Sequence, residues 1–148
     1  MVDTTKFSRV INAPLRYTYE WCTDFREDDS KLTGSTSKKK IVEKTKKRAV
    51  YVTVYQGADG KEKVAVSYVT LKPPNAWYLE QFGEEDYETG VYRLKSLGKK
   101  RTRLDMVFKE TWKEIAKIPT MEEQIEGTNK AWDQFIAALE RDYEAESK

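Results

Sequence analysis

The sequence predicts an α+β fold in which a seven-stranded, curved antiparallel sheet wraps around one long C-terminal helix, with two short helices after the first strand. Two observations predict this arrangement. Between residues 38 and 112, β-branched and aromatic runs alternate with turn residues, which is typical of strands. From Met121 onward, apolar residues instead recur at steps of three and four, which is helical spacing. The terminal helix therefore has a single apolar stripe, and the sheet is the surface available to cover it.

The N-terminal part begins with an expected strand at residues 5–12. Asn12-Ala13-Pro14 opens the first short helix, because proline lacks only an N–H that a first helical turn does not need. Asn12 or Ala13 is the expected cap. The second short helix is expected near residues 24–30, and residues 34–37 (Gly-Ser-Thr-Ser) end it.

Six further strands are expected at residues 40–46, 49–56, 62–72, 77–82, 87–97 and 101–112. Asp59-Gly60 is a hairpin signal, and Pro73-Pro74 ends a strand because proline cannot donate to the ladder. The sequence does not show which face of the strands at 40–46 and 49–56 points inward. We expect the valines of 49–56 to face the core, and Tyr68 to face the helix.

The helical stripe consists of eight residues: Met121, Ile125, Thr128, Trp132, Phe135, Ile136, Leu139 and Tyr143. Acidic residues dominate the opposite side. A long helix on a curved sheet either completes a solid core or closes a cavity. We expect a cavity, because a strongly twisted sheet curves more than the helix that it wraps.

Composition narrows the function. The net charge is +2, from 27 basic and 25 acidic residues, so no nucleic-acid partner is expected. The chain has no histidine, which excludes Ser-His-Asp and Cys-His catalysis within it. One cysteine, Cys22, allows no internal disulfide. No apolar run approaches the ~20 residues that span a bilayer. We expect a cytoplasmic monomer without a cofactor or a metal site.

Residues 7–21, FSRVINAPLRYTYEW, combine an alternating strand, an Ala-Pro helix start and an aromatic residue at Trp21. This pattern and the element order resemble the START/Bet v 1-like (SRPBCC) superfamily with the helix-grip fold, over a single domain at residues 1–148. The resemblance implies a deep apolar cavity between sheet and final helix. Family members bind lipids, sterols, plant hormones or polyketides. Some are aromatase/cyclases, and some, similar to Aha1, assist chaperones.

The function expected from these features is non-enzymatic binding or transport of a small hydrophobic ligand, such as a lipid, an isoprenoid or a polyketide-like molecule. No catalytic residue is assigned. The expected ligand-binding residues combine aromatic walls with a few polar groups, and simple core filling is the alternative for each of them: Tyr68, Trp77, Tyr92, Leu94, Leu104, Met106, Phe108, Glu110, Trp112, Ile125, Thr128, Trp132 and Phe135.

Two alternatives remain open. A polyketide cyclase/dehydratase-like enzyme would use Glu110, Tyr92 or Arg9, and it requires two of these in one pocket with a raised carboxyl pKa. We expect Glu110 and Glu88 to sit in water near a sheet end, and Arg9 to point outward. An Aha1-like protein-interaction module instead predicts a solid core and an exposed apolar patch.

Overall fold

The computed structural model describes residues 2–28, 32, 36–57, 59–115 and 117–147. Its elements follow the chain as β1 (Val2–Ile11), α1 (Leu15–Cys22), β2 (Lys38–Lys44), β3 (Arg48–Gln56), β4 (Glu62–Lys72), β5 (Ala76–Gly83), β6 (Asp86–Gly98), β7 (Arg101–Trp112) and α2 (Met121–Glu146). The expected strands and the long C-terminal helix are confirmed.

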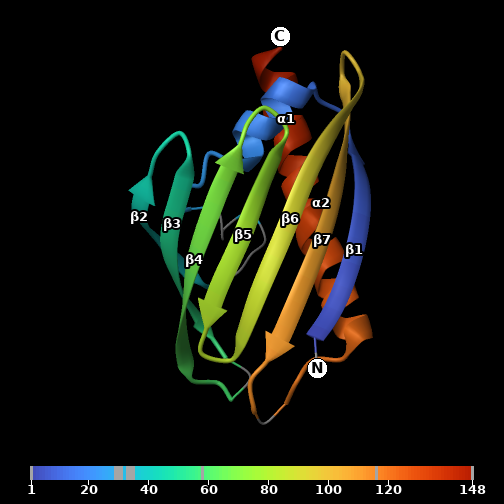
Figure 1. Cartoon of the computed structure of the whole chain (residues 1–148). Helices are drawn as coiled ribbons and strands as arrows, with labels where there is room; N and C mark the ends of the chain where they lie inside the picture. The colour runs from blue at the N-terminus through green and yellow to red at the C-terminus, as the bar shows by residue number, and fades with distance from the viewer. Residues whose placement is uncertain (1, 29–31, 33–35, 58, 116, 148) are drawn as a thin grey trace.

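The strands form one antiparallel sheet in the order β1-β7-β6-β5-β4-β3-β2. Chain neighbours pair throughout, except that β1 closes onto β7. Figure 1 shows α2 crossing behind the β1, β7 and β6 side of the sheet, with α1 at the end where the C-terminus lies. At that end the indole N–H of Trp21 donates to the Asp142 carboxylate at 2.9 Å, and the rings of Tyr17 and Tyr143 lie 5.0 Å apart. These contacts fix α1 against the last turns of α2.

The two short helices differ from expectation in detail. The N-cap of α1 is Pro14, whereas Asn12 or Ala13 was expected in that position. Residues 24–28 do not form the expected second helix. Residues 29–30 of that expected helix, and residues 34–35 of the segment expected to end it, lie outside the described residues. Helix α2 starts with a capping box in which Thr120 and Glu123 each accept a hydrogen bond from the other's backbone N–H. No helix in the described ranges is long and apolar enough to cross a membrane.

The inward faces of β3 and β4 are the reverse of those expected. Tyr51 belongs to the core and its ring stacks on Phe25 at 5.8 Å. Val50 pairs with Tyr68 across the two strands, so both side chains lie on the outer side of the sheet. Tyr68 is 43% exposed and its ring meets Phe82. The expectation that the valines face the core and that Tyr68 faces the helix is wrong, because both strands alternate regularly and neither sequence marks its inner face.

The orientation of β1 also differs from expectation. Phe7, Arg9 and Ile11 form the row that faces α2, and Val10 is exposed. Arg9 forms an ion pair with Asp133 of α2 and donates to the Asn129 carbonyl. The outward Arg9 of the sequence interpretation is therefore wrong. A carboxylate on the overlying helix makes the inward position favourable for the guanidinium.

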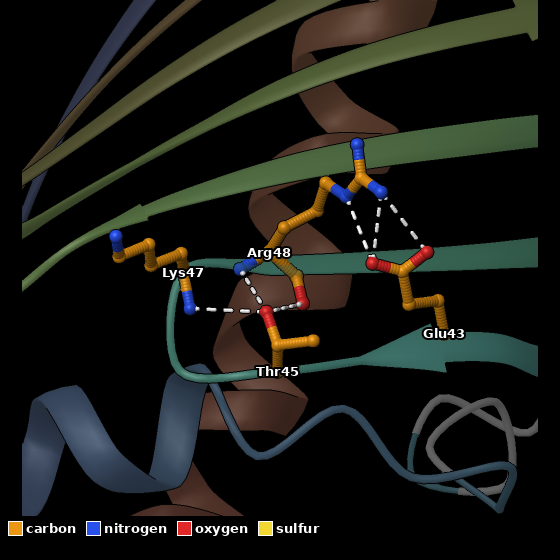
Figure 2. A network of polar contacts seen from close by, with 4 residues as sticks. All are labelled: Glu43, Thr45, Lys47 and Arg48. Atoms are coloured by element: carbon orange, nitrogen blue, oxygen red, sulfur yellow. Dashed lines mark hydrogen bonds and ion pairs between the residues drawn. The ribbon is translucent and has the colours of Figure 1, made fainter.

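The turn between β2 and β3 is held by side-chain hydrogen bonds (Figure 2). The Thr45 hydroxyl accepts from the backbone N–H groups of Lys47 and Arg48 and donates to the Arg48 carbonyl. The Arg48 guanidinium binds the Glu43 carboxylate through two nitrogens. A threonine that bonds nearby backbone in this way stabilises a tight turn.

Candidate functional site

The apolar stripe of α2 is buried along only half of the helix. Near the C-terminal end, Ile136 and Leu139 are 8% and 1% exposed. Near the N-terminal end, Met121 and Ile125 are each 39% exposed. The first half of α2 is therefore less closely packed than the second, and three neighbouring hollows lie on the inner face of the sheet.

The first, the helix hollow, has a volume of about 280 Å³ between α2, β1, β6 and β7. Aromatic rings and polar groups alternate in its wall, which consists of Thr5, Glu88, Tyr92, Phe108, Glu110, Gln124, Gly127, Thr128, Ala131 and Trp132. Gly90, which pairs with Phe108, has little room for a side chain, because a methyl group there would meet the rings of Tyr92 and Phe108 at 3.0–3.1 Å.

The second, the aromatic hollow, has a volume of about 150 Å³ and shares Tyr92 and Trp132 with the first. Its walls are Trp21, Cys22, Phe25, Leu32, Lys39, Tyr51, Trp77, Tyr92, Trp132 and Phe135. Trp77 and Tyr92 stack with ring centroids 4.8 Å apart and an interplanar angle of 10°. Trp132 meets Phe135 edge-on at 5.4 Å. The amine of Lys39 lies 4.4 Å from the centre of the Tyr51 ring, a cation–π contact at the rim.

The third, the acidic hollow, has a volume of about 320 Å³ and shares Glu88 and Glu110 with the helix hollow. It is lined by Ser37, Thr53, Tyr55, Ala65, Gln81, Glu85, Asp86, Glu88, Glu110 and Trp112. Burial, reinforced by Glu85, raises the pKa of Tyr55 to about 12. The indole N–H of Trp112 is buried and has no hydrogen-bond partner among the residues that the structure describes.

A line of polar side chains crosses the inner face of the sheet between these hollows. Strand pairing places five residues in register, each opposite the next, and we name them the polar row: Asp3, Glu110, Glu88, Gln81 and Ser67. The Ser67 hydroxyl donates to the Gln81 side-chain oxygen at 2.7 Å, and Gln124 of α2 donates to the Asp3 carboxylate at 3.0 Å. Directly paired residues on antiparallel strands project to the same side, so the row is continuous.

The two central carboxyl groups of the row are strongly perturbed. Burial raises the pKa of Glu110 to about 10, helped by hydrogen bonds and repulsion from Asp86 and Glu88. Burial likewise raises the pKa of Glu88 to about 7, with a contribution from Asp86. At neutral pH the Glu110 carboxyl therefore keeps its proton and can donate a hydrogen bond. The expectation that both groups sit in water is wrong, because the register places them under α2.

Tyr92 lines both the helix hollow, which contains carboxyl groups, and the aromatic hollow. Burial raises the pKa of its hydroxyl well above the usual value, with a smaller effect from Glu88. The ring separates the helix hollow from the aromatic hollow and packs edge-on against Phe108 at 5.5 Å. A neutral hydroxyl and a neutral carboxyl thus face one hollow, which can hydrogen-bond a ligand oxygen or nitrogen or exchange a proton with it.

A hard cation is the other group that these carboxyls could hold. Oxygens of Asp86, Glu88 and Glu110 lie within 4.8 Å of one another. Such a set resembles the oxygen ligands that Mg²⁺ or Ca²⁺ take. The acidic stretch near residue 24 is different in kind, because Arg26 lies between Asp24 and Asp28 and forms ion pairs with both. The expected lack of a metal site stays a prediction.

The structure brings most of the expected ligand-binding residues together. Tyr92, Phe108, Glu110, Thr128 and Trp132 line the helix hollow, Trp77 and Phe135 join in the aromatic hollow, and Trp112 lines the acidic one. Three are core residues that line none of these hollows: Leu94, Leu104 and Met106. Ile125 is partly exposed and lines none of these hollows, and Tyr68 lies on the opposite face of the sheet.

Sequence reasoning missed two groups of residues. Trp21, Cys22, Phe25 and Tyr51 of the aromatic hollow come from α1, the segment after it and β3. Their aromatic character was visible, but their convergence depends on how α1 sits over the sheet. The other group belongs to the polar row: Gln81 was not considered, and Glu88 was expected to sit in water. Aligning the hairpins in register would have placed both on the inner face.

The comparisons with known proteins bear on the fold. No protein-family model and no curated protein sequence matches the chain. Among solved structures, the Zhui aromatase/cyclase from Streptomyces matches with a TM-score of 0.76 at 15% identity, over 100% of this chain and 97% of that one.

Two further solved structures match over nearly their whole length. A START superfamily protein from Mycobacterium smegmatis has a TM-score of 0.70 at 14% identity, over 96% of this chain and 97% of that one. Ara h 8.0201 has a TM-score of 0.70 at 15% identity, over 98% and 99%. The chain therefore has the helix-grip fold of START and Bet v 1-like proteins, as its sequence predicted. Identities at this level concern the fold and carry no function.

Proposed function

We propose that this chain binds a small hydrophobic molecule, lipid, isoprenoid or polyketide-like, between its sheet and α2, and that it acts as a carrier or sensor. In this proposal it works as a cytoplasmic monomer, with residues 1–148 as one domain. The observation that supports it is the aromatic-walled hollow between the sheet and the first half of α2, which is lined from the helix by Gln124, Thr128 and Trp132.

The walls suit such a ligand. Small-molecule sites are mostly apolar and aromatic, with a few polar groups that fix orientation. The helix hollow has this composition, with Tyr92, Phe108 and Trp132 beside Thr128 and Glu110. Its volume of about 280 Å³ is near the lower end of ligand cavities, which start at about 300 Å³. The ligand is therefore of modest size, nearer to a fused-ring compound than to a two-chain lipid.

The test is a binding titration with the neutral fluorophore N-phenyl-1-naphthylamine. Ala131 lines the helix hollow, whereas Ala137 lies exposed on the same helix. Ala131→Phe places a ring into the hollow, and Ala137→Phe makes the same chemical change in water. We expect the wild type and Ala137→Phe to bind alike, and Ala131→Phe to lose at least about tenfold in affinity, since filled volume excludes the probe.

Two outcomes overturn this proposal. Wild-type protein that is folded by circular dichroism but binds no probe has no usable cavity. Equal binding by both phenylalanine variants places the probe elsewhere on the surface.

An acid–base enzyme of the cyclase or dehydratase type is the second candidate. The observation in its favour is that Tyr92 and Glu110 line the same hollow, and that burial raises the pKa of Glu110 to about 10. An acid that is protonated at neutral pH can protonate a carbonyl or a leaving hydroxyl. Mass spectrometry of a bound polyketide-like ligand separates the two candidates. An unchanged mass supports the carrier, and a loss of water that disappears in Glu110→Gln supports the enzyme.

The protein-interaction alternative receives less support. A protein-interaction module requires a filled core, and the hollows beside α2 are evidence against such a core. Its other requirement, an exposed apolar patch, has a partial counterpart in Tyr68 and Phe82 on the outer face of the sheet. A pull-down that depended on Tyr68 and Phe82 but not on Ala131 would favour it over ligand binding.

A further inference from the structure

We propose that the carboxyl-lined end of the helix hollow receives the protonated amine of a ligand whose apolar body lies against the aromatic walls. This inference rests on the proposed binding function and names the chemistry of the ligand. It starts from Asp86, Glu88 and Glu110, whose carboxyl oxygens gather within 4.8 Å of one another.

These carboxyls lack a cationic partner in the part of the chain that the structure describes. None of the ion pairs between described residues involves Asp86, Glu88 or Glu110, and neither the helix hollow nor the acidic hollow is lined by lysine or arginine. The elements packed against them present Asp3 and Thr5 from β1, Tyr92 from β6, and the neutral Gln124 and Thr128 from α2. Every charged side chain among the described residues that line these two hollows is therefore acidic, and a cation is what the site lacks.

A second observation points to a ligand at the same place. Tyr92 is partly buried and lines the hollow beside Glu88 and Glu110, and its hydroxyl forms no hydrogen bond with a described residue. Buried polar groups are normally satisfied, so an unused hydroxyl facing a cavity is suited to a guest. An ammonium group has three donors, which the two glutamates and Tyr92 can accept together.

The aromatic walls favour an organic amine over a metal ion. Tyr92, Phe108 and Trp132 line the hollow next to the carboxyls. A metal ion would bring only a small, hydrated charge and leave these rings unused. An amine carried on a ring system fills the apolar part, and its charge is attracted both by the carboxylates and by the ring faces.

Binding should be coupled to proton release. Without ligand, Glu110 holds a proton because an ionised carboxylate there would be buried next to Glu88 and Asp86. An ammonium ion supplies the missing positive charge and stabilises the ionised form. The Glu110 proton then passes to the solvent as the amine enters, and no covalent bond changes.

The experiment compares two ligands of matched shape by isothermal titration calorimetry, 2-(2-naphthyl)ethylamine and 2-(2-naphthyl)ethanol, at pH 8. We expect the amine to bind the wild type at least about tenfold more tightly. Repeating the titration in buffers of different ionisation enthalpy should show a proton released with the amine and none with the alcohol.

The double variant Glu88→Gln/Glu110→Gln should bind both ligands within about threefold of each other. The matched control, Glu122→Gln/Glu126→Gln, removes the same charge from exposed positions of α2 and should keep the preference. Because the wild-type comparison needs no variant, the test stands even if the double variant fails to fold.

The outcomes separate this inference from the proposed function. If the alcohol binds and the amine binds no better, the amine site is wrong and the hydrophobic cavity stands. If neither binds while N-phenyl-1-naphthylamine does, the amine site is also wrong. If none of the three binds, both fail. Saturable binding of Mn²⁺ that needs Glu88 and Glu110, without any preference for the amine, would replace this inference with a metal site.

Discussion

Glu88 and Glu110 face each other directly across the β6–β7 strand pair, and their side chains share a hydrogen bond on the face of the sheet that α2 covers. Two carboxyls placed side by side away from bulk water cannot both ionise cheaply. Strand pairing thus places on the cavity wall a proton that the folded chain holds more tightly than the unfolded chain does.

The first prediction concerns the pH dependence of stability. The folded pKa is raised from 4.5 to about 7 for Glu88 and to about 10 for Glu110. A raised carboxyl pKa means that the folded state binds more protons, so the free energy of unfolding falls as the pH rises through this window. We expect urea denaturation to give lower stability at pH 9 than at pH 5. No histidine is present to titrate between these values.

Glu110→Gln should flatten this dependence. At pH 8 we expect the variant to be more stable than the wild type by on the order of 1 kcal/mol, after discounting for the solvent that reaches the open hollow. At pH 4, where the wild-type carboxyls are protonated, the two should agree. Glu122→Gln, on the exposed side of α2, should retain the wild-type slope. A stability that rises between pH 5 and pH 9 would contradict the burial of the pair.

The second prediction pairs two glycines that line or border the same hollow. A Cβ at Gly90 would lie 3.0 Å from the Tyr92 ring and 3.1 Å from the Phe108 ring. Gly90→Ala should therefore cost about 1–2 kcal/mol in urea denaturation, because two packed rings must move. At Gly127 a Cβ meets nothing within 4 Å, so Gly127→Ala should add about 1 kcal/mol through helix propensity. Equal effects at both positions would show that Gly90 is not tightly packed.

The third prediction concerns the turn shown in Figure 2. Thr45→Ala removes the hydroxyl that accepts from Lys47 and Arg48, and it should lower the unfolding free energy by about 1 kcal/mol. Thr45→Ser keeps the hydroxyl and should recover most of the loss. Glu43→Gln breaks only an exposed ion pair with Arg48, and its cost should stay below about 0.5 kcal/mol. A larger cost for Glu43→Gln than for Thr45→Ala would reverse this ranking.

The sequence was sufficient for the fold and for part of the site. Strand positions followed from β-branched runs and turn residues, so β4 and β7 have the expected bounds. The inner face of β3 was not predictable, because Tyr51 and Val50 are both good strand residues on opposite sides. Only the covering elements decide which side is the core.

The burial of the polar row was likewise not predictable from the sequence around each residue. Glu88 and Glu110 have the parity of inward residues, yet a carboxyl on a strand is usually solvated. Their burial follows from the position of α2 and from cross-strand register, neither of which is encoded near either residue. Likewise, the stripe on α2 correctly predicted a sheet-facing side, but not that its first half would be less buried than its second half.

The last prediction concerns that first half of α2, which has little packing to hold it. Met121 and Ile125 are each 39% exposed, so the start of the helix depends on the capping box and on the bond from Gln124 to Asp3. Thr120→Ala should cost about 1 kcal/mol, and the loss should be local. In hydrogen exchange we expect amides of residues 124–128 to exchange about fivefold faster, and those of residues 136–140 to be unchanged, because Ile136 and Leu139 are buried. Thr120→Ser, which can still cap, should restore the slow exchange. Faster exchange along the whole helix would instead mean that α2 opens as one unit, and that the roof of the hollow cannot move independently of the core.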